Sequence, residues 1–220
     1  MPPQSYTKPG LLLCEGKNDQ HVIWALCEAH GISETFSVQV PSQLNGTEAD
    51  GIDAVLASIP GYLKRTEIRN LGILIDADDK LEQRWQRLRQ VLTDESKRPV
   101  LPPLPLPEGT VVQRDDTRRV GAWLMPDNRL HGKLEDFLLA LAPDRSNNPQ
   151  LSEVDAFLPR VPPPRFEDKD LAKARIHAFL AVQAEPGKPL GQAVTARYLR
   201  PDAPTAAGFV DWLRKMFQVA

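Results

Sequence analysis

The chain has 220 residues, and its formal net charge of −2 at pH 7 excludes the strongly basic composition of many nucleic-acid-binding domains, although basic side chains can still cluster locally. Two cysteines and four scattered histidines give neither a disulfide framework nor the spacing of a zinc site. A hydrophobic fraction of 41%, the lack of an apolar run near the roughly 20 residues that cross a bilayer, and the absence of a signal-peptide pattern after Met1 predict a cytoplasmic protein with no membrane contact.

The first predicted strand, residues 11–14, is an apolar run that leads into Glu15 and Gly16. A helix over about 19–30 follows, with Asn18 or Asp19 as its N-cap, because apolar residues recur on one helical face. Taken alone, Glu15 is most simply interpreted as a turn carboxylate. A second acidic motif farther along the chain reverses that interpretation.

A strand over 36–40 and a helix over 49–65 precede this second motif, in which the strand 71–75 runs directly into Asp76 and Asp78. Short apolar runs of this kind are typical of buried parallel strands, whose carboxyl ends share one edge of the sheet, where ligands collect. If the strand continues for two more residues, both aspartates point the same way. Neighbouring carboxylates repel unless a cation or proton lies between them, so these residues predict a magnesium site together with Glu15.

The helix predicted over 79–93 has an apolar stripe that turns its arginines away from the core. We interpret Arg84, Arg87 and Arg89 as a solvated helix face, with contact to phosphates as the less favoured alternative. The proline-rich segment 99–107 is expected to form a stiff surface crossover rather than a site for docking a partner.

Strands over 110–113 and 120–125 complete an alternation of strands and helices that predicts an α/β fold, a mostly parallel sheet with helices on both faces. Asp127 follows the last strand and has an ordinary turn role, which does not exclude a metal contact. In the next helix, Glu135 lies about 100° around from the apolar stripe, toward the proposed site. Asp136 is better suited to capping that helix or to solvent.

A proline cluster at 159–164 separates this core from a helical tail, whose helices are predicted around 171–180 and 209–217. The apolar faces of these helices need a surface to cover. We therefore expect residues 1–145 to form the α/β core and residues 146–220 a C-terminal helical extension packed on it.

Two acidic motifs carry a family resemblance. The runs Glu15-Gly16-Lys17 with Asp19, and Asp76-Ala77-Asp78, resemble the TOPRIM signature of topoisomerases, primases and the overcoming-lysogenization-defect nucleases. This resemblance covers about residues 10–140 and implies a TOPRIM-like, Rossmann-like core. The segments 126–128 and 132–136 more narrowly resemble a bacterial TOPRIM-related family of unknown function, over most of the chain.

The resemblance implies roles for individual residues. Glu15 would be a general acid/base or a metal ligand, Asp76 and Asp78 the main ligands of Mg²⁺ or Mn²⁺, and Glu135 would help to hold a second metal. Lys17 stands at the start of a helix, where free N–H groups favour a phosphate.

The departures from the TOPRIM enzymes narrow the expected activity. The chain has no ATPase domain, no tyrosine placed for topoisomerase chemistry and no zinc-binding primase element. What remains is a small metal-dependent nuclease, a phosphodiesterase acting on nucleic acid, for example in phage defence or with a partner protein. The alternative is a non-catalytic TOPRIM-like module that binds nucleic acid, a nucleotide or a partner protein. The substrate, the oligomeric state and the physiological partner stay open.

Overall fold

Five strands of the computed structural model form one sheet in the order β2-β1-β3-β5-β4. The structure describes residues 8–42, 50–96, 100–143, 149–162 and 165–219. The strands are β1 (Gly10–Leu13), β2 (Phe36–Gln39), β3 (Asn70–Asp76), β4 (Thr110–Gln113) and β5 (Arg119–Met125). Each of the five predicted strands is confirmed, with ends that differ by at most one residue.

The sheet is mostly parallel, as predicted. Strand β1 pairs in parallel with β2 and β3, and β3 pairs in parallel with β5. Strand β4 runs antiparallel to β5 because a short connection joins the two as a hairpin. The proline-rich crossover that precedes β4 contains no helix or strand over its described residues 100–107, and the carbonyl of Pro102 accepts a hydrogen bond of 3.2 Å from the indole of Trp85.

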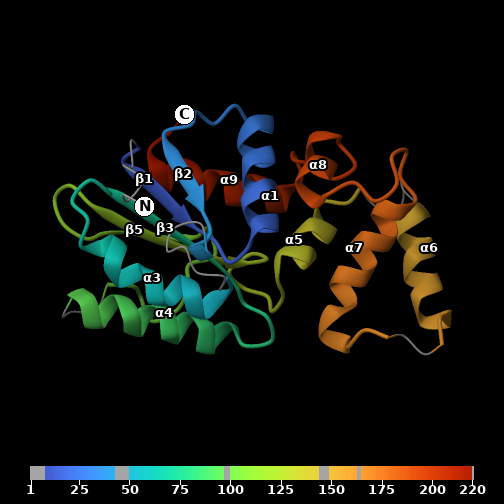
Figure 1. The fold of residues 1–220 in the computed structure, drawn as a ribbon, viewed down its shortest axis with the longest axis horizontal. Coiled ribbons are helices and arrows are strands. Elements are labelled where there is room, and N and C mark those ends of the chain that lie inside the picture. The colour runs from blue at the N-terminus through green and yellow to red at the C-terminus, as the bar shows by residue number, and fades with distance from the viewer. Residues whose placement is uncertain (1–7, 43–49, 97–99, 144–148, 163–164, 220) are drawn as a thin grey trace.

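Helices cover both faces of the sheet, which confirms the predicted fold class (Figure 1). Helices α3 (Ile52–Leu63) and α4 (Leu81–Ser96) pack on one face, and α1 (Lys17–Ala29) and α9 (Pro204–Phe217) pack on the other. Successive strand residues alternate between the two faces. Leu12 and Leu74 belong to the α1/α9 side of the core, whereas Leu11 and Ile73 belong to the α3/α4 side.

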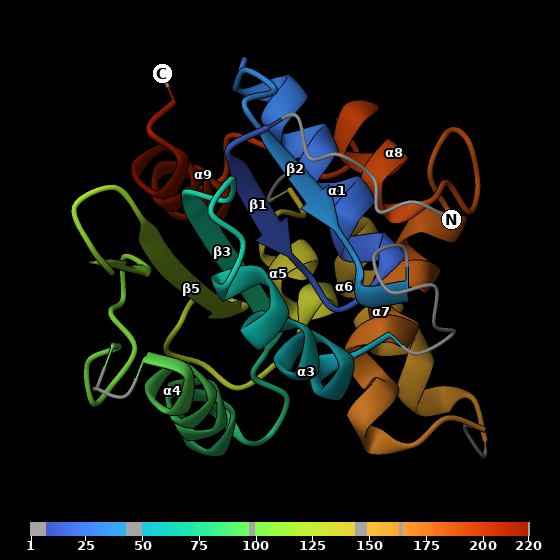
Figure 2. The ribbon, with the colours of Figure 1, turned by 60° about the vertical axis from the view of Figure 1, so that its left-hand side comes forward.

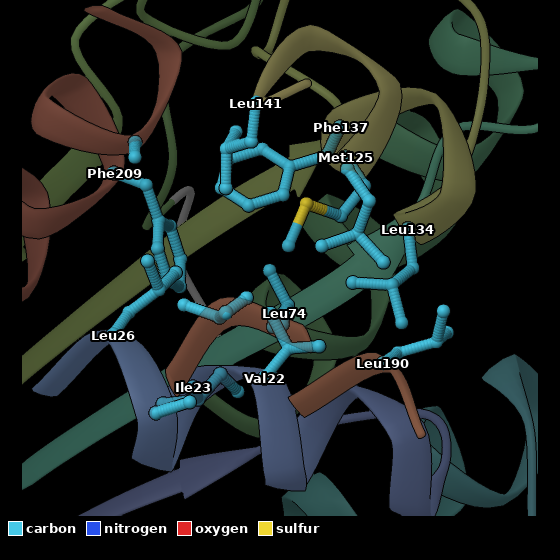
Figure 3. Packing of buried hydrophobic residues seen from close by; sticks show 14 of the residues in the cluster. Val22, Ile23, Leu26, Leu74, Met125, Leu134, Phe137, Leu141, Leu190 and Phe209 are labelled. Atoms are coloured by element: carbon cyan, nitrogen blue, oxygen red, sulfur yellow. The ribbon is translucent and has the colours of Figure 1, made fainter. Parts of the chain in front are cut away.

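The α1/α9 side of the core is rich in aromatic residues. Phe209 of α9 packs edge-on against Trp123 of β5, with ring centroids 5.3 Å apart, and close to Trp212. Glycines in the sheet let α9 approach closely: a Cβ added at Gly72 would lie 3.0 Å from the Phe217 ring. Figure 3 shows how side chains from the sheet, α1, α5, α8 and α9 meet in this part of the core.

Four further helices extend the α1/α9 side. They are α5 (Leu134–Ala140), α6 (Pro149–Phe157), α7 (Leu171–Ala181) and α8 (Leu190–Thr195). Helix α8 packs on α1, and α7 packs on both α5 and α6, so α6 and α7 lie side by side at one end of the molecule (Figure 1). Helices α6 and α8 are short and were not predicted. In the described part of the chain, no helix has the length and apolar character to cross a bilayer.

Candidate functional site

In the sheet, β1 lies between β2 and β3. The chain passes from β1 to β2 on one side and then crosses to β3 on the other, so the strand order reverses between β1 and β3. Crevices at such a switch point, beyond the carboxyl ends of the strands, are where open α/β sheets bind ligands. Strands β1 and β3 point toward the same end of the sheet, near α3 and α5 (Figure 2). Glu15 follows β1 and Asp76 ends β3, so the two acids meet at this point.

The backbone fixes the carboxylates of Glu15 and Asp76. Glu15 Oε1 accepts a hydrogen bond of 2.8 Å from the amide of Asp76, and the Glu15 carboxylate also accepts the amide of Ile52 at the start of α3. Asp76 Oδ1 accepts the amide of Leu134, the first residue of α5, at 3.1 Å. The backbone at strand ends and helix starts therefore holds both acids in place. The N–H groups at the helix starts also favour negative charge.

Asp19 joins these acids; the sequence placed it in the motif that resembles the TOPRIM signature and gave it a possible capping role, but did not predict it as a site residue. Helix α1 begins at Lys17 after Gly16, so the prediction that Asn18 or Asp19 is the N-cap is wrong. Asp19 lies in the first turn of the helix, where its Oδ2 accepts the Gly16 amide at 3.0 Å, and it is 7% exposed. The sequence feature that could have placed Asp19 near the other acids was its position about one helical turn after Glu15.

Glu135 and Asp136 take different positions, as the helical spacing predicted. Glu135 is 9% exposed, and its charge acts on Asp19 and Asp76. Asp136 Oδ2 instead accepts the amide of Lys133 at 2.9 Å, which caps the start of α5. We call Glu15, Asp19, Asp76, Asp78 and Glu135 the acidic cluster.

Asp78 reaches the acidic cluster by a route that the sequence did not predict. Strand β3 ends at Asp76, and Asp78 adopts a left-handed conformation with φ of 49°, so the condition on which both aspartates would point the same way is not met. Backbone hydrogen bonds of 2.7 and 2.6 Å join Asp78 to Gly132. Its Oδ2 accepts a hydrogen bond of 2.7 Å from Arg84 Nη2. Arg84 is therefore half-buried in an ion pair, whereas we predicted a solvated side chain.

Burial and neighbouring charges raise the pKa values of three members of the cluster, Glu15, Asp19 and Asp76. Burial raises the pKa of Asp76 well above its usual range, and the charges of Asp19, Glu15, Asp78 and Glu135 raise it further. Burial also raises the pKa of Glu15 to about 7, opposed by the hydrogen bond from the Asp76 amide. The pKa of Asp19 is raised to about 7 by burial and then by the charge of Glu15. Like charges in a partly dry site disfavour ionisation of one another.

The donor chemistry of the acidic cluster suits a hard divalent cation, which prefers carboxylate oxygens. As the side chains stand, however, no three His, Cys, Asp or Glu residues within the described ranges are arranged to hold a metal ion together. The Asp78 carboxylate is paired with Arg84. Binding of a cation here would require side-chain rotation.

Two other predicted site residues, Lys17 and Asp127, are not members of the acidic cluster. Lys17 is exposed at the first position of α1. Asp127 has the predicted turn role, because its Oδ1 accepts the amides of Arg129 and Leu130 at 3.0 and 2.8 Å. Asp127 lines a pocket of about 270 Å³ beside Trp123, and its charge is not among those that shift the pKa values of the cluster.

These pKa values predict how the stability of the metal-free protein depends on pH. A carboxyl with a raised pKa binds more protons in the folded than in the unfolded state, so stability falls as pH rises through that interval. For Glu15 the interval runs from 4.5 to about 7. We expect the free energy of unfolding, measured with urea in metal-free buffer, to fall by roughly 1–3 kcal/mol across it.

The variant Glu15→Gln provides the control, because it removes one of the titrating groups and should flatten the curve. Asp53, Asp115 and Asp202 have lowered pKa values, so their stabilising contribution is constant between pH 4.5 and 7 and is lost only as pH falls below about 3.8. A free energy of unfolding that rises between pH 4.5 and 7 would contradict the raised pKa values.

The fold and the acidic cluster define an α/β protein with buried carboxylates at the switch point of a five-stranded sheet. The family described as "Protein of unknown function (DUF3226)" matches residues 9–218, and the chain belongs to this DUF3226 family. The match extends through the C-terminal helices, as the narrower resemblance implied. Neither a curated protein nor a solved structure matches the chain significantly.

Proposed function

We propose that this protein is a phosphodiesterase of the TOPRIM type that acts on nucleic acid and depends on Mg²⁺ or Mn²⁺. The observation that carries the proposal is the acidic cluster, in which carboxylates from the ends of β1 and β3 and the starts of α1 and α5 meet at the switch point. The motifs that resemble the TOPRIM signature supply Glu15, Asp76 and Asp78 to this cluster. The other members are Asp19 and Glu135.

The burial of several like charges supports a cation as the partner of the cluster. An isolated carboxylate is costly to bury, and the raised pKa values of Glu15, Asp19 and Asp76 express that cost. Glu15, Asp76 and Asp78 would be the main ligands, with Glu135 supporting a second ion. A bound divalent cation would neutralise charge on the phosphate oxygens during hydrolysis.

The residues of the chain itself supply positioning and proton transfer. The amide of Leu134 orients Asp76, and the amides of Asp76 and Ile52 orient Glu15. In the metal-free protein, burial raises the pKa of Glu15 to about 7, a value that suits a general acid or base; in that role Glu15 would leave the metal to Asp76 and Asp78. Lys17 presents a positive charge to solvent at the start of α1, where a phosphate is favoured.

A second candidate is the non-catalytic binding module, and a specific observation favours it. Glu15, Asp19 and Asp76 each accept a backbone hydrogen bond, and Asp78 forms an ion pair. In this alternative the acids have a purely structural role, in which they join strand ends to helix starts. The two candidates differ in how the protein responds to a metal and to the loss of one charge.

The variant Asp76→Asn separates the candidates. Asparagine can still accept the Leu134 amide, so without metal the variant should be as stable as the parent or more stable, because a repelled charge is gone. At a Mg²⁺ or Mn²⁺ concentration near 100 times Kd, binding stabilises the parent by ~2.7 kcal/mol, which raises Tm by roughly 5–10 °C. Thermal unfolding should show this rise in the parent and not in the variant.

The matched control is Asp211→Asn, which removes an exposed carboxylate on α9, so the metal-induced rise should remain. A metal-dependent cleavage assay on DNA and RNA oligonucleotides accompanies the unfolding experiments. A parent Tm that does not respond to either metal would favour the binding module. Marked destabilisation by Asp76→Asn without metal would identify Asp76 as a structural hydrogen-bond acceptor.

A further inference from the structure

A cleft of about 650 Å³ adjoins the acidic cluster on the side of α4 and the start of α5. Its cationic side chains come from separate parts of the chain: Lys80 from the residue before α4, Arg84 from the first turn of α4, Lys133 from the residue before α5, and Lys169 from the tail. His131 also lines the cleft. We call this feature the basic cleft. Asp78 and Arg84, which form the ion pair at the edge of the acidic cluster, also line the basic cleft.

The acids that line the basic cleft are largely engaged elsewhere. Asp78 pairs with Arg84, and Asp136 caps α5 through the amide of Lys133, which leaves Asp79 exposed to solvent. Lys80 forms no ion pair with any residue that the structure describes. Asp78 is thus compensated by Arg84 and Asp136 is engaged by a backbone amide, and Asp79 stays an exposed negative charge, whereas Lys80 is available to an incoming anion.

The remaining lysines form pairs that an anion can displace. Lys133 Nζ lies 3.4 Å from Asp170, and Lys169 Nζ lies 2.7 Å from Glu167, with Lys169 and Glu167 largely exposed. Exposed ion pairs of this kind contribute about 0–1 kcal/mol. A phosphate group that enters the cleft can therefore recruit Lys169 at little cost, whereas the more buried Lys133 must exchange its contact with Asp170 for the phosphate.

Arg84 connects the basic cleft to the acidic cluster. Its Nη2 donates to Asp78, and its charge lowers the pKa of Glu15. Its Nε is buried and has no hydrogen-bond partner among the described residues. Guanidinium groups carry five donors in a planar fork that matches a phosphate, and a buried donor without an acceptor is costly. The Arg84 side chain thus has donors to spare beside the cleft.

We propose that the basic cleft binds the phosphate groups of a nucleic-acid strand and that Arg84 anchors the phosphate nearest to the acidic cluster. This inference rests on the proposed function in one respect: that function explains why the bound strand would run toward the acidic cluster. The binding itself requires neither a metal nor cleavage. Lys80, Lys133 and Lys169 then hold neighbouring phosphates along the strand.

The test measures binding of a fluorescein-labelled single-stranded oligonucleotide at low salt in buffer freed of divalent cations. Arg84→Met is expected to weaken binding about tenfold, which is typical of a lost charge-assisted hydrogen bond. Lys169→Gln changes an exposed side chain and should fold normally, with a loss of roughly twofold to fivefold. Inorganic pyrophosphate is expected to displace the oligonucleotide from the parent.

The matched control is Arg87→Met, on the same helix and with the same loss of charge. Arg87 is largely exposed, pairs with Asp53 and does not line the cleft, so binding should be nearly unchanged. Three results would overturn the proposal: no oligonucleotide binding by the parent, equal losses from Arg84→Met and Arg87→Met, or no competition by pyrophosphate. If the oligonucleotide binds but metals leave Tm unchanged, the cleavage activity fails while the basic cleft stands.

Discussion

If the protein has the proposed metal-dependent cleavage activity on nucleic acid, replacement of Glu135 by Gln is expected to leave it folded and to lower that activity by roughly a hundredfold. The Glu135 carboxylate is 9% exposed and accepts no hydrogen bond from the described residues, so no structural bond is lost. Its charge nevertheless acts on Asp19 and Asp76, which places it beside the proposed ligands. Cleavage rates and urea unfolding of the same preparation separate an effect on the site from an effect on the fold.

Asp136→Asn is the control for this prediction. Asp136 is the next residue of the same helix, but its carboxylate caps α5, and asparagine retains an oxygen that can accept the Lys133 amide. We expect cleavage near the parental rate and a change in stability below about 1 kcal/mol. Similar small effects from both substitutions would leave Glu135 as a charge at the start of a helix.

Replacement of Phe209 by Ala should cause the largest loss of stability, about 3–5 kcal/mol. Phe209 is fully buried and packs against Trp123, Phe137 and Trp212, so its removal leaves a cavity between α9 and the sheet. The same change at Phe157, a side chain of α6 that is 52% exposed, should cost less than about 1 kcal/mol. Urea unfolding at one pH measures both, and equal losses would contradict the role of α9 in the core.

The sheet was predictable from the sequence because each strand is a short apolar run with a clear end. The residues beyond these ends were harder to place, since their conformation depends on tertiary partners. Asp78 leaves the strand direction because its backbone pairs with Gly132, a contact across 54 residues of chain that no local pattern reveals. The ion pair of Arg84 with Asp78 is likewise a tertiary contact that depends on where Asp78 lies, so it was missed although the helix that carries Arg84 was predicted.

The candidate site was predictable as far as strand ends define it. Glu15 and Asp76 follow apolar runs, and parallel pairing of β1 with β3 then brings them together. Asp19 was not identified because an acid in the first turn of a helix usually serves as a cap, and its side chain does accept the Gly16 amide. Only the packing of α1 against the sheet shows that it also meets the other acids.

The position of α9 has a consequence for the synthesis of the protein. Helices α3 and α4 come from residues 52–96, so one face of the sheet can be covered while translation continues. The other face includes Trp123 and is completed by α9, which ends at Phe217. A ribosome-bound chain therefore carries an uncovered apolar surface until α9 emerges, and such surfaces attract chaperones and aggregate. Premature termination before α9 would leave that surface permanently exposed.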